Sequence, residues 1–411
     1  MNDLKKENLQ FNKMIKFYLY YAVLVSLVNL LNFSIIFYYA VSLLFIPLTF
    51  YYLFKVIKIK NLFLIIIVLS MSFWNIITVL RGLVFDFSII GRMLTSSTYF
   101  FPMIIPFFSL LKFNTNVIKQ IINVIVVLDL FFLGFVVLLL FVLSSDLIEI
   151  INTYEGISKF FVYPNTFLLL NFYYLKPKHR IISIISFLVP LLIAMFLARR
   201  GQIFYFSISL FFSLLLNVTY FNKRKIIRNS LLIVIFGIIG FYVINLFSAN
   251  ISKTFSLLTE RIDSDTRGTV EDCFYSDMTF TDFVFGKGID GRFYCPGADT
   301  DYDNNTTSLE NSGYRYNIET GYLDVILKGG FISLFIYFLV NIVSIVKGGL
   351  FSTNGLVKAC SLYLVINLAC VWIENSQAFT LRYILVWLCI GICFSKEIKS
   401  ISNQELKKSL G

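Results

Sequence analysis

The sequence predicts an all-α polytopic membrane protein, and three observations support this fold class. Of the 411 residues, 58% are hydrophobic and only 14% are charged, a balance that soluble globular domains do not have. A spanning helix needs about 20 apolar residues, and runs of about that length recur along the chain. Basic residues also gather in every second connection between these runs, on one side of the predicted membrane. We therefore expect membrane lipid around the protein and no nucleic-acid partner.

The apolar runs predict about twelve transmembrane helices. The expected spans are 14–31, 35–54, 62–80, 93–111, 118–143, 160–175, 181–198, 203–220, 230–248, 321–343, 359–373 and 376–395. The loops on one side, together with both termini, hold 22 of the 35 basic residues, and the assignment alternates without conflict. The positive-inside rule places that side in the cytoplasm, so both termini are predicted to be cytoplasmic.

One long polar segment, residues 249–320, interrupts the spans on the outer side between the ninth and tenth helices. It divides the chain into residues 1–248 with nine helices, the loop 249–320, and residues 321–411 with three helices and a tail. The loop is too long for an ordinary connection, which suggests a functional role. Its aromatic and glycine residues predict a folded cap. Its two cysteines, Cys273 and Cys295, form a disulfide in an oxidising compartment or remain free thiols.

Lysine and arginine are distributed unequally across the predicted membrane. The inner side holds 19 of the 23 lysines, whereas the outer side holds nine of the twelve arginines. Orientation requires only positive charge, but arginine also presents a planar fork that binds phosphate in a bidentate manner. The distribution of arginine therefore predicts that the outer face binds an anion. Alternatively, the loop arginines pair with the 13 acidic residues of the same loop.

Three local motifs follow one another along the chain. The first is Leu197-Ala198-Arg199-Arg200-Gly201, between two spans. The second starts at Arg267 and includes Phe285-Gly286-Lys287-Gly288. The third runs from Glu319 through Tyr322 and Asp324 to Gly329-Gly330-Phe331. Their order resembles that of the O-antigen polymerase and O-antigen ligase superfamily of bacterial membrane glycosyltransferases. The resemblance covers roughly residues 181–345.

The resemblance implies a polymerase that acts at the periplasmic face of the bacterial inner membrane. No pattern in the sequence resembles a metal site, so we expect a metal-independent reaction without cofactors. Its donor and acceptor would be glycans on undecaprenyl pyrophosphate, and a chain-length regulator and a flippase are candidate protein partners. Glu319 stands where ligases of the superfamily tend to carry histidine, which favours a polymerase. A ligase that transfers glycan to lipid A-core remains an alternative. A flippase is a further alternative, although two similar halves would be expected of it and none is evident.

The resemblance and the chemistry together assign roles to individual residues. Arg200 and Arg267 match the arginines of the family and are predicted to stabilise the pyrophosphate leaving group. Glu319 is a candidate general base for the acceptor hydroxyl. The predicted substrate-binding residues are Arg199, Arg292, Arg315, Tyr322, Asp324, Arg382, Gly286 and Gly288, and no residue is predicted to bind a metal.

Purely structural roles are the alternative for several of these residues. Glu319 would then be a favourable charge at a helix N-terminus. Asp324 would form an i,i+4 pair with Lys328, and Arg382 would pair with Glu374. Asp129, near the middle of the fifth predicted span, must face protein or water, and we expect a packing role for it.

Overall fold

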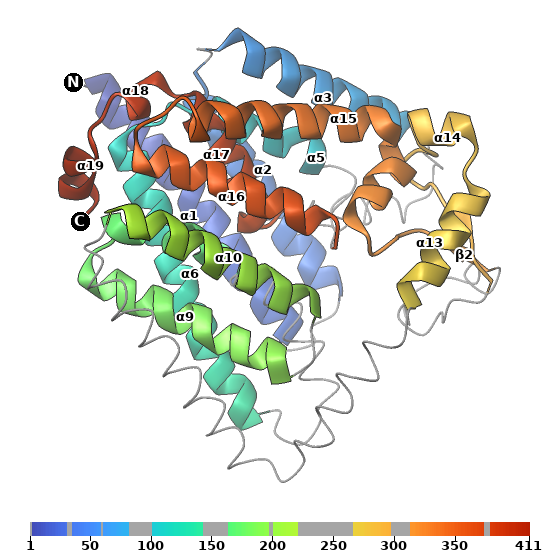
Figure 1. Ribbon diagram of the computed structural model, residues 1–411, viewed down its shortest axis with the longest axis horizontal. Coiled ribbons are helices and arrows are strands. Elements are labelled where there is room, and N and C mark those ends of the chain that lie inside the picture. Colours follow the sequence, from blue (N-terminus) through green and yellow to red (C-terminus); the bar gives the residue numbers. More distant parts are fainter. Residues whose placement is uncertain are drawn as a thin grey trace.

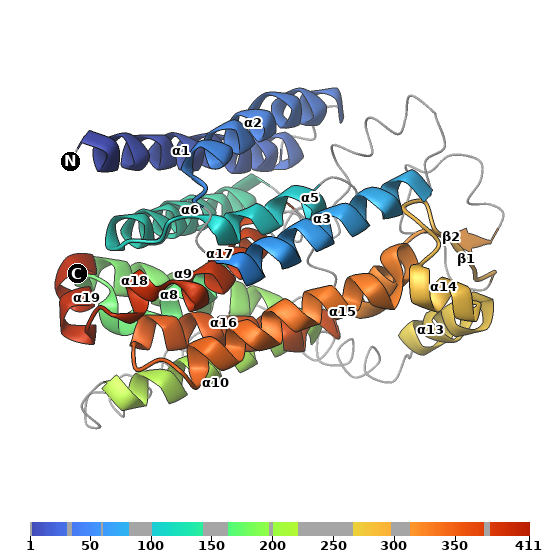
Figure 2. The same ribbon diagram turned by 90° about the horizontal axis from the view of Figure 1, so that it is seen from above.

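The structure is a computed structural model that describes residues 2–30, 35–58, 61–81, 101–142, 163–196, 200–220, 266–296, 313–373 and 379–411. Most of its helices lie side by side in a bundle, and a small cap sits at one end (Figure 1). The chain termini, which the views mark N and C, lie at the opposite end (Figures 1 and 2). We call these the cap end and the terminal end.

The bundle contains long helices joined by short helical turns. In chain order it consists of α1 (Asn2–Leu30), α2 (Ile35–Val56), α3 (Leu62–Arg81), α5 (Phe101–Ile104), the 3-10 turn η1 (Ile105–Leu110), α6 (Thr115–Val142), α8 (Asn165–Leu170), the 3-10 turn η2 (Phe172–Tyr174), α9 (Pro177–Phe196), α10 (Arg200–Tyr220), α15 (Gly321–Gly349), α16 (Gly355–Val371), α17 (Leu381–Phe394), α18 (Lys396–Lys399) and α19 (Asn403–Leu410). The cap consists of α13 (Thr266–Asp277), α14 (Phe280–Phe285) and an antiparallel hairpin of β1 (Phe293–Tyr294) and β2 (Tyr314–Arg315).

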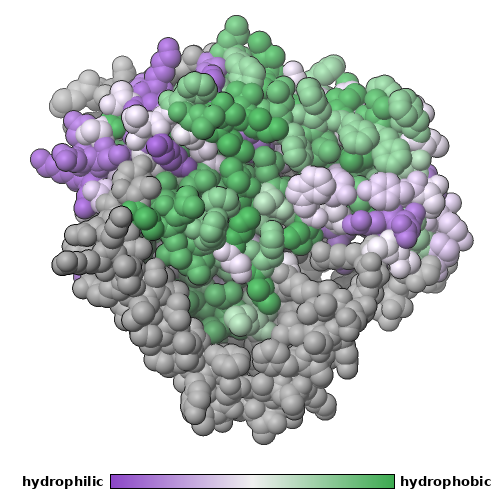
Figure 3. Space-filling view, in the orientation of Figure 1, coloured by the Kyte–Doolittle hydropathy of each residue, from purple (hydrophilic) through white to green (hydrophobic). Residues whose placement is uncertain are grey.

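The bundle has the character of a membrane-embedded protein. Among the described residues, six helices are long and apolar enough to cross a bilayer, within α2, α3, α6, α9, α10 and α15. Their outward faces carry large apolar side chains, and Phe73 and Phe335 are 65% and 66% exposed. In Figure 3 a hydrophobic band separates hydrophilic residues at the two ends. Such extensive apolar exposure indicates contact with lipid. The predicted all-α membrane class is confirmed at this level.

Several predicted spans look different in the structure. The run 160–175 contains α8, whose six residues rise only about 9 Å, and the 3-10 turn η2. The described part of the run 93–111 consists of the short α5 and η1. The run 230–248 lies outside the described residues. The number of twelve spans therefore stays a prediction.

The apolar character of α8 reflects burial in protein. All six of its residues are buried in the bundle. Asn165 donates from Nδ2 to Ser183 O at 2.8 Å and accepts from Ser183 Oγ at 2.7 Å, which ties α8 to α9. Asn171 donates from Nδ2 back to Phe167 O at 2.8 Å where the helix ends. A core segment and a spanning segment have the same hydropathy, so composition did not distinguish them.

The cap has a hydrophobic core of its own. Its buried members come from α13, the hairpin and the first turns of α15: Phe274, Met278, Phe293, Cys295, Ile318, Leu323, Ile326 and Leu327. Helix α14 begins with a capping box of Thr279 and Asp282, directly after the short turn that follows α13. The described part of the predicted loop 249–320 is therefore folded. The N-terminal part of α15 packs in the same core and is part of the cap.

Cys273 and Cys295 form a disulfide that joins α13 to the residue after β1. The bond closes a segment of 22 residues, for which the loss of chain entropy on unfolding corresponds to about 3 kcal/mol. We expect the variant Cys273→Ala/Cys295→Ala to make the cap more susceptible to limited proteolysis, with earlier thermal unfolding. Cys370→Ala, which removes a buried free thiol of α16, is the control. Equal protease resistance of the two variants would contradict a bracing role.

Candidate functional site

The cap is held to the bundle at a break in α15. Gly330 has φ 67° and ψ −175°, so the helix is interrupted there although it continues on both sides. A break leaves carbonyl groups without their helical partners, and buried carbonyls need new ones. Three carbonyls before the break accept hydrogen bonds from other segments: Leu327 O from Lys287 N at 2.8 Å, Lys328 O from Gly288 N at 3.1 Å and Gly329 O from Trp74 Nε1 at 2.8 Å. We call this contact the joint.

The predicted Gly-x-Gly pair is part of the joint. Gly286 and Gly288 have φ of 74° and 86°, which glycine adopts readily. A Cβ on Gly286 would lie 2.3 Å from Lys328 O, and a Cβ on Gly330 would lie 2.1 Å from Val284 O. The two backbones therefore touch. This close approach explains Gly286 without a ligand, and the positive φ explains Gly288, so their predicted role in substrate binding has no separate support here.

Arg81 also serves the joint. Its guanidinium donates from Nη1 to Phe285 O at 2.7 Å and from Nη2 to Gly286 O at 2.9 Å. The side chain comes from the last turn of α3, which runs beside α15 to the cap in Figure 2. This arginine of the outer set is thus occupied with backbone carbonyls.

Asp324 and Lys328 lie inside the cap, where both side chains are buried. Lys328 donates from Nζ to Gly291 O at 3.0 Å and to Tyr316 O, which ties α15 to the segments on both sides of the hairpin. The two side chains, one helical turn apart, also interact electrostatically. Asp324 is only 1% exposed, so it is removed from any ligand at the surface.

Arg292 and Arg315 belong to the hairpin of the cap. The Arg292 guanidinium lies 4.2 Å from the centre of the Tyr316 ring, a cation–π distance. Arg315 is half-buried and is paired in register with Phe293. Lys287 forms an ion pair with Asp277 at 2.5 Å beneath this region. Both arginines are therefore placed on the cap.

A seam of polar and aromatic side chains runs where the cap meets the bundle. We define the seam as Glu271 and Tyr275 of α13, Glu319, Tyr322 of α15 and Trp372 at the end of α16. The Tyr275 and Tyr322 hydroxyl oxygens are 3.4 Å apart, and the Tyr322 and Trp372 ring centres are 4.6 Å apart. Glu319 is exposed, and the next residue, Thr320, donates from Oγ1 to Glu271 Oε1. The seam thus combines two carboxylates with three aromatic rings, of which Trp372 is 57% exposed.

The first motif reaches the same place. Helix α10 begins at Arg200, and a Cβ on Gly201 would lie 3.2 Å from Ile373 Cγ2. Ile373 follows Trp372 of the seam, so the start of α10 packs beside it. Arg267 is the second residue of α13 and lies one turn before Glu271. Arg199 and the side chains of Arg200 and Arg267 lie outside the described part of the structure. The backbones of the first and third motifs therefore meet at the seam, and the second motif begins on α13, the helix that carries Glu271 and Tyr275.

Arg382 lies deeper in the bundle, at the start of α17, and is only 4% exposed. Its guanidinium carbon is 4.0 Å from the centre of the Tyr163 ring and 5.1 Å from that of Tyr205. Tyr205 belongs to α10, one turn after Gly201, and its hydroxyl donates to Tyr163 O at 3.1 Å. Glu374, the predicted partner of Arg382, lies outside the described residues. Arg382 of α17 therefore contacts α10, the helix that begins at the first motif, through the rings of Tyr163 and Tyr205.

Asp129 of α6 is almost completely buried, in agreement with the prediction that it faces protein. The sequence analysis did not single out Glu271, Tyr275, Trp372, Tyr163 or Tyr205. Trp372 stands at the end of an apolar run, a position typical of aromatic residues at a membrane surface, so hydropathy offered a signal for it. The other four carried no local signal, because only the folded cap and bundle place them at a site.

Comparison of the chain with protein-family models, with curated proteins and with solved structures finds no match. The ligand class must therefore follow from the side chains of the seam. Carboxylates accept hydrogen bonds from hydroxyl groups, and aromatic rings stack on apolar faces of ring compounds. A sugar carries both hydroxyl groups and apolar faces, so the seam is chemically suited to a saccharide.

Proposed function

We propose that the protein polymerises undecaprenyl-pyrophosphate-linked O-antigen repeat units by glycosyl transfer. The observation that supports this most is the seam, where Glu319, exposed aromatic rings and the start of α10 lie together at one end of a membrane-embedded bundle. A lipid-linked glycan has its sugars outside the bilayer and its isoprenoid within it. A site at the edge between cap and bundle suits both parts of such a substrate.

In the proposed reaction, a hydroxyl group of the acceptor repeat unit attacks the anomeric carbon of the donor glycan. Glu319 accepts the hydroxyl proton as general base. The bond between the anomeric carbon and the phosphate oxygen breaks, and undecaprenyl pyrophosphate leaves with the bonding electrons. Arg200 and Arg267 stabilise the charge that develops on this leaving group, and Arg199 is a neighbouring candidate contact. Tyr322 contributes a stacking surface for a sugar.

The proposal includes the location and the topology. We place the protein in the bacterial inner membrane, with about twelve spans, cytoplasmic termini and the cap in the periplasm. The separation of the termini from the cap in Figure 2 agrees with this orientation. The disulfide of the cap suits an oxidising compartment. A flippase that delivers the substrate and a chain-length regulator are the proposed protein partners.

The test is deletion of the gene in its own host, followed by gel separation of the lipopolysaccharide. A polymerase defect leaves chains with a single repeat unit, because ligation still occurs. Loss of every repeat unit would instead indicate a ligase or a flippase, and an unchanged ladder would contradict all three functions. Restoration of the ladder by the intact gene is the control.

We expect Glu319→Gln to abolish most polymerisation while the amount of protein in the membrane stays normal. Glutamine keeps the size of the side chain but cannot accept the proton. The measurement is the length distribution of the polymer, with immunoblotting for abundance. Asp272→Asn, which neutralises an exposed acid on the same cap, is the matched control and should retain the ladder. If abundance falls in step with polymer length, Glu319 acts as a helix-terminal charge instead.

A further inference from the structure

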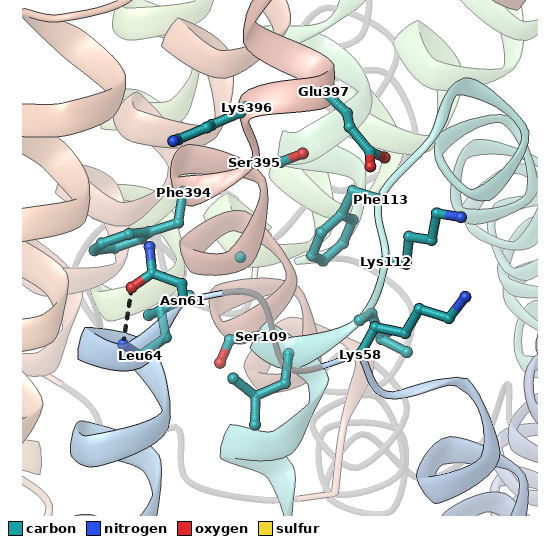
Figure 4. Close-up of a pocket in the computed structure, with 13 residues that line it drawn as sticks. Lys58, Asn61, Leu64, Ser109, Lys112, Phe113, Phe394, Ser395, Lys396 and Glu397 are labelled. Carbon is teal, nitrogen blue, oxygen red and sulfur yellow. Dashed lines mark hydrogen bonds between the residues drawn. The ribbon is translucent and has the colours of Figure 1, made fainter.

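A hollow lies at the terminal end, far from the seam along the bundle. Its volume is about 420 Å³, within the usual size range of ligand sites (Figure 4). Three segments line it: the connection between α2 and α3, the connection between η1 and α6, and the end of α17 with the start of α18. Because all three segments lie at the ends of bundle helices, the hollow is at the level where a bilayer meets water. We call it the basal pocket.

The basal pocket has a defined backbone frame. Ile57 and Leu111 form an antiparallel bridge, and Lys58 N donates to Leu110 O at 3.1 Å, so two of the connections are bonded together. Gly391 lets α17 approach them closely, because a Cβ there would lie 2.4 Å from both Ser109 O and a ring carbon of Phe113. The positions of the lining side chains are therefore set by bonded and closely packed segments.

The rim of the pocket is basic. Lys58, Lys112 and Lys396 line it together with one acid, Glu397, which gives a formal charge of +2. In Figure 4, Lys58 and Lys112 extend on one side of the pocket and Lys396 lies on the other. The hydroxyl groups of Ser109 and Ser395 and the amide of Asn61 add hydrogen-bonding groups. Such a rim favours an anion.

The wall of the pocket is apolar. Leu64, Leu110, Phe113 and Phe394 contribute to the lining. Leu64 belongs to the buried face of α3, whereas Ile66, Leu69 and Phe73 form the exposed apolar face of the same helix. A free inorganic anion would gain nothing from these surfaces, whereas a phosphate attached to acyl chains would bury apolar groups against them. The pocket therefore joins a lysine rim to a lipid-facing helix.

We propose that the basal pocket binds the phosphate headgroup of an anionic phospholipid from the leaflet at the terminal end. The lysines hold the phosphate, and the acyl chains lie along α3. Each lysine near an anionic membrane surface strengthens binding by a factor of about five. Three lysines at one headgroup would therefore favour an anionic lipid over a zwitterionic one by at least about tenfold. This site is independent of the proposed glycosyl transfer.

The test measures lipid binding to the purified full-length protein in detergent by native mass spectrometry, with phosphatidylglycerol and phosphatidylcholine as probes. We expect tighter binding of one phosphatidylglycerol, reduced at least about tenfold in Lys58→Gln/Lys112→Gln/Lys396→Gln. The control Lys176→Gln/Lys178→Gln/Lys408→Gln removes the same charge from lysines elsewhere on the chain and should bind normally. If the pocket variant does not remain folded, Lys112→Gln is compared with Lys178→Gln, with an expected loss of about fivefold.

Competition with inorganic phosphate separates the two sources of a phosphate group. Millimolar phosphate should not displace the bound phosphatidylglycerol if the acyl chains contribute to binding. Displacement by phosphate, without a preference between the two lipids, would overturn the proposal and indicate a soluble phosphate ligand. Equal losses in the pocket variant and in its control would also overturn it, because general surface charge would then explain the binding.

Discussion

Gly330→Ala is expected to disrupt the attachment of the cap to the bundle. Alanine at φ 67° and ψ −175°, a region that is essentially confined to glycine, costs about 1–3 kcal/mol, and its Cβ would lie 2.1 Å from Val284 O. That oxygen belongs to the backbone and cannot move aside alone, so α14 and α15 must separate. Separation breaks the hydrogen bonds to the carbonyls of Leu327 and Lys328. A buried carbonyl that is left without a partner costs about 1–3 kcal/mol. We expect a total destabilisation of about 4 kcal/mol or more, at the upper end for single substitutions.

The matched control for this variant is Gly134→Ala. Gly134 lies in α6, and nothing is within 4 Å of the position of a Cβ there, so alanine should be neutral or should stabilise the helix by up to about 1 kcal/mol. Thermal unfolding in detergent and limited proteolysis of the cap would measure both variants. If Gly330→Ala unfolds at the wild-type temperature with a protease-resistant cap, the joint does not hold the cap in place.

Arg200→Lys is expected to lower the rate of polymerisation by at least about 100-fold, the usual effect of removing one charge-stabilising donor. Lysine keeps the positive charge but loses the planar fork that contacts two phosphate oxygens. The residue starts α10 beside the seam, so the change affects the proposed position of the leaving group. Polymer formation in membranes with purified lipid-linked repeat units would give the rate.

Arg199→Lys provides the comparison for this variant. The resemblance assigns the phosphate contact to Arg200, because a small residue is usual at the position of Arg199. We expect Arg199→Lys to retain most of the rate, with equal amounts of both proteins in the membrane. A near-normal rate for Arg200→Lys would contradict the pyrophosphate contact, and equal large losses would assign the phosphate to the pair.

Hydropathy predicted the class of the fold because lipid-facing helices must be apolar along their whole length. It did not show that α8 would be only six residues long, since Asn165 and Ser183 make the bonds that place that segment inside the protein. It also did not show the break in α15, although Gly329-Gly330 was part of a motif. The break depends on carbonyl partners supplied by the cap and by Trp74, which lie far away in the sequence.

The candidate site was predictable only in part. Glu319 and Tyr322 were singled out, and the structure places both at the seam. Asp324, only five residues after Glu319, is buried in the cap because its face of α15 packs inward. Gly286 was expected to touch substrate, but the structure uses its backbone to approach α15. The motifs singled out these positions, whereas the role of each residue depends on neighbours that the fold supplies.

The joint has a consequence for the evolution of the cap. At the joint, backbone N–H groups of the cap bond to the carbonyls of α15, and the α3 side chains Trp74 and Arg81 also bond to carbonyls. The joint therefore requires glycine where the two backbones meet, and the rest of the attachment depends on Lys328 and on the buried core that the cap shares with α15. Exposed residues of the cap can therefore change without loss of the attachment, provided that these glycines and the buried core residues are retained.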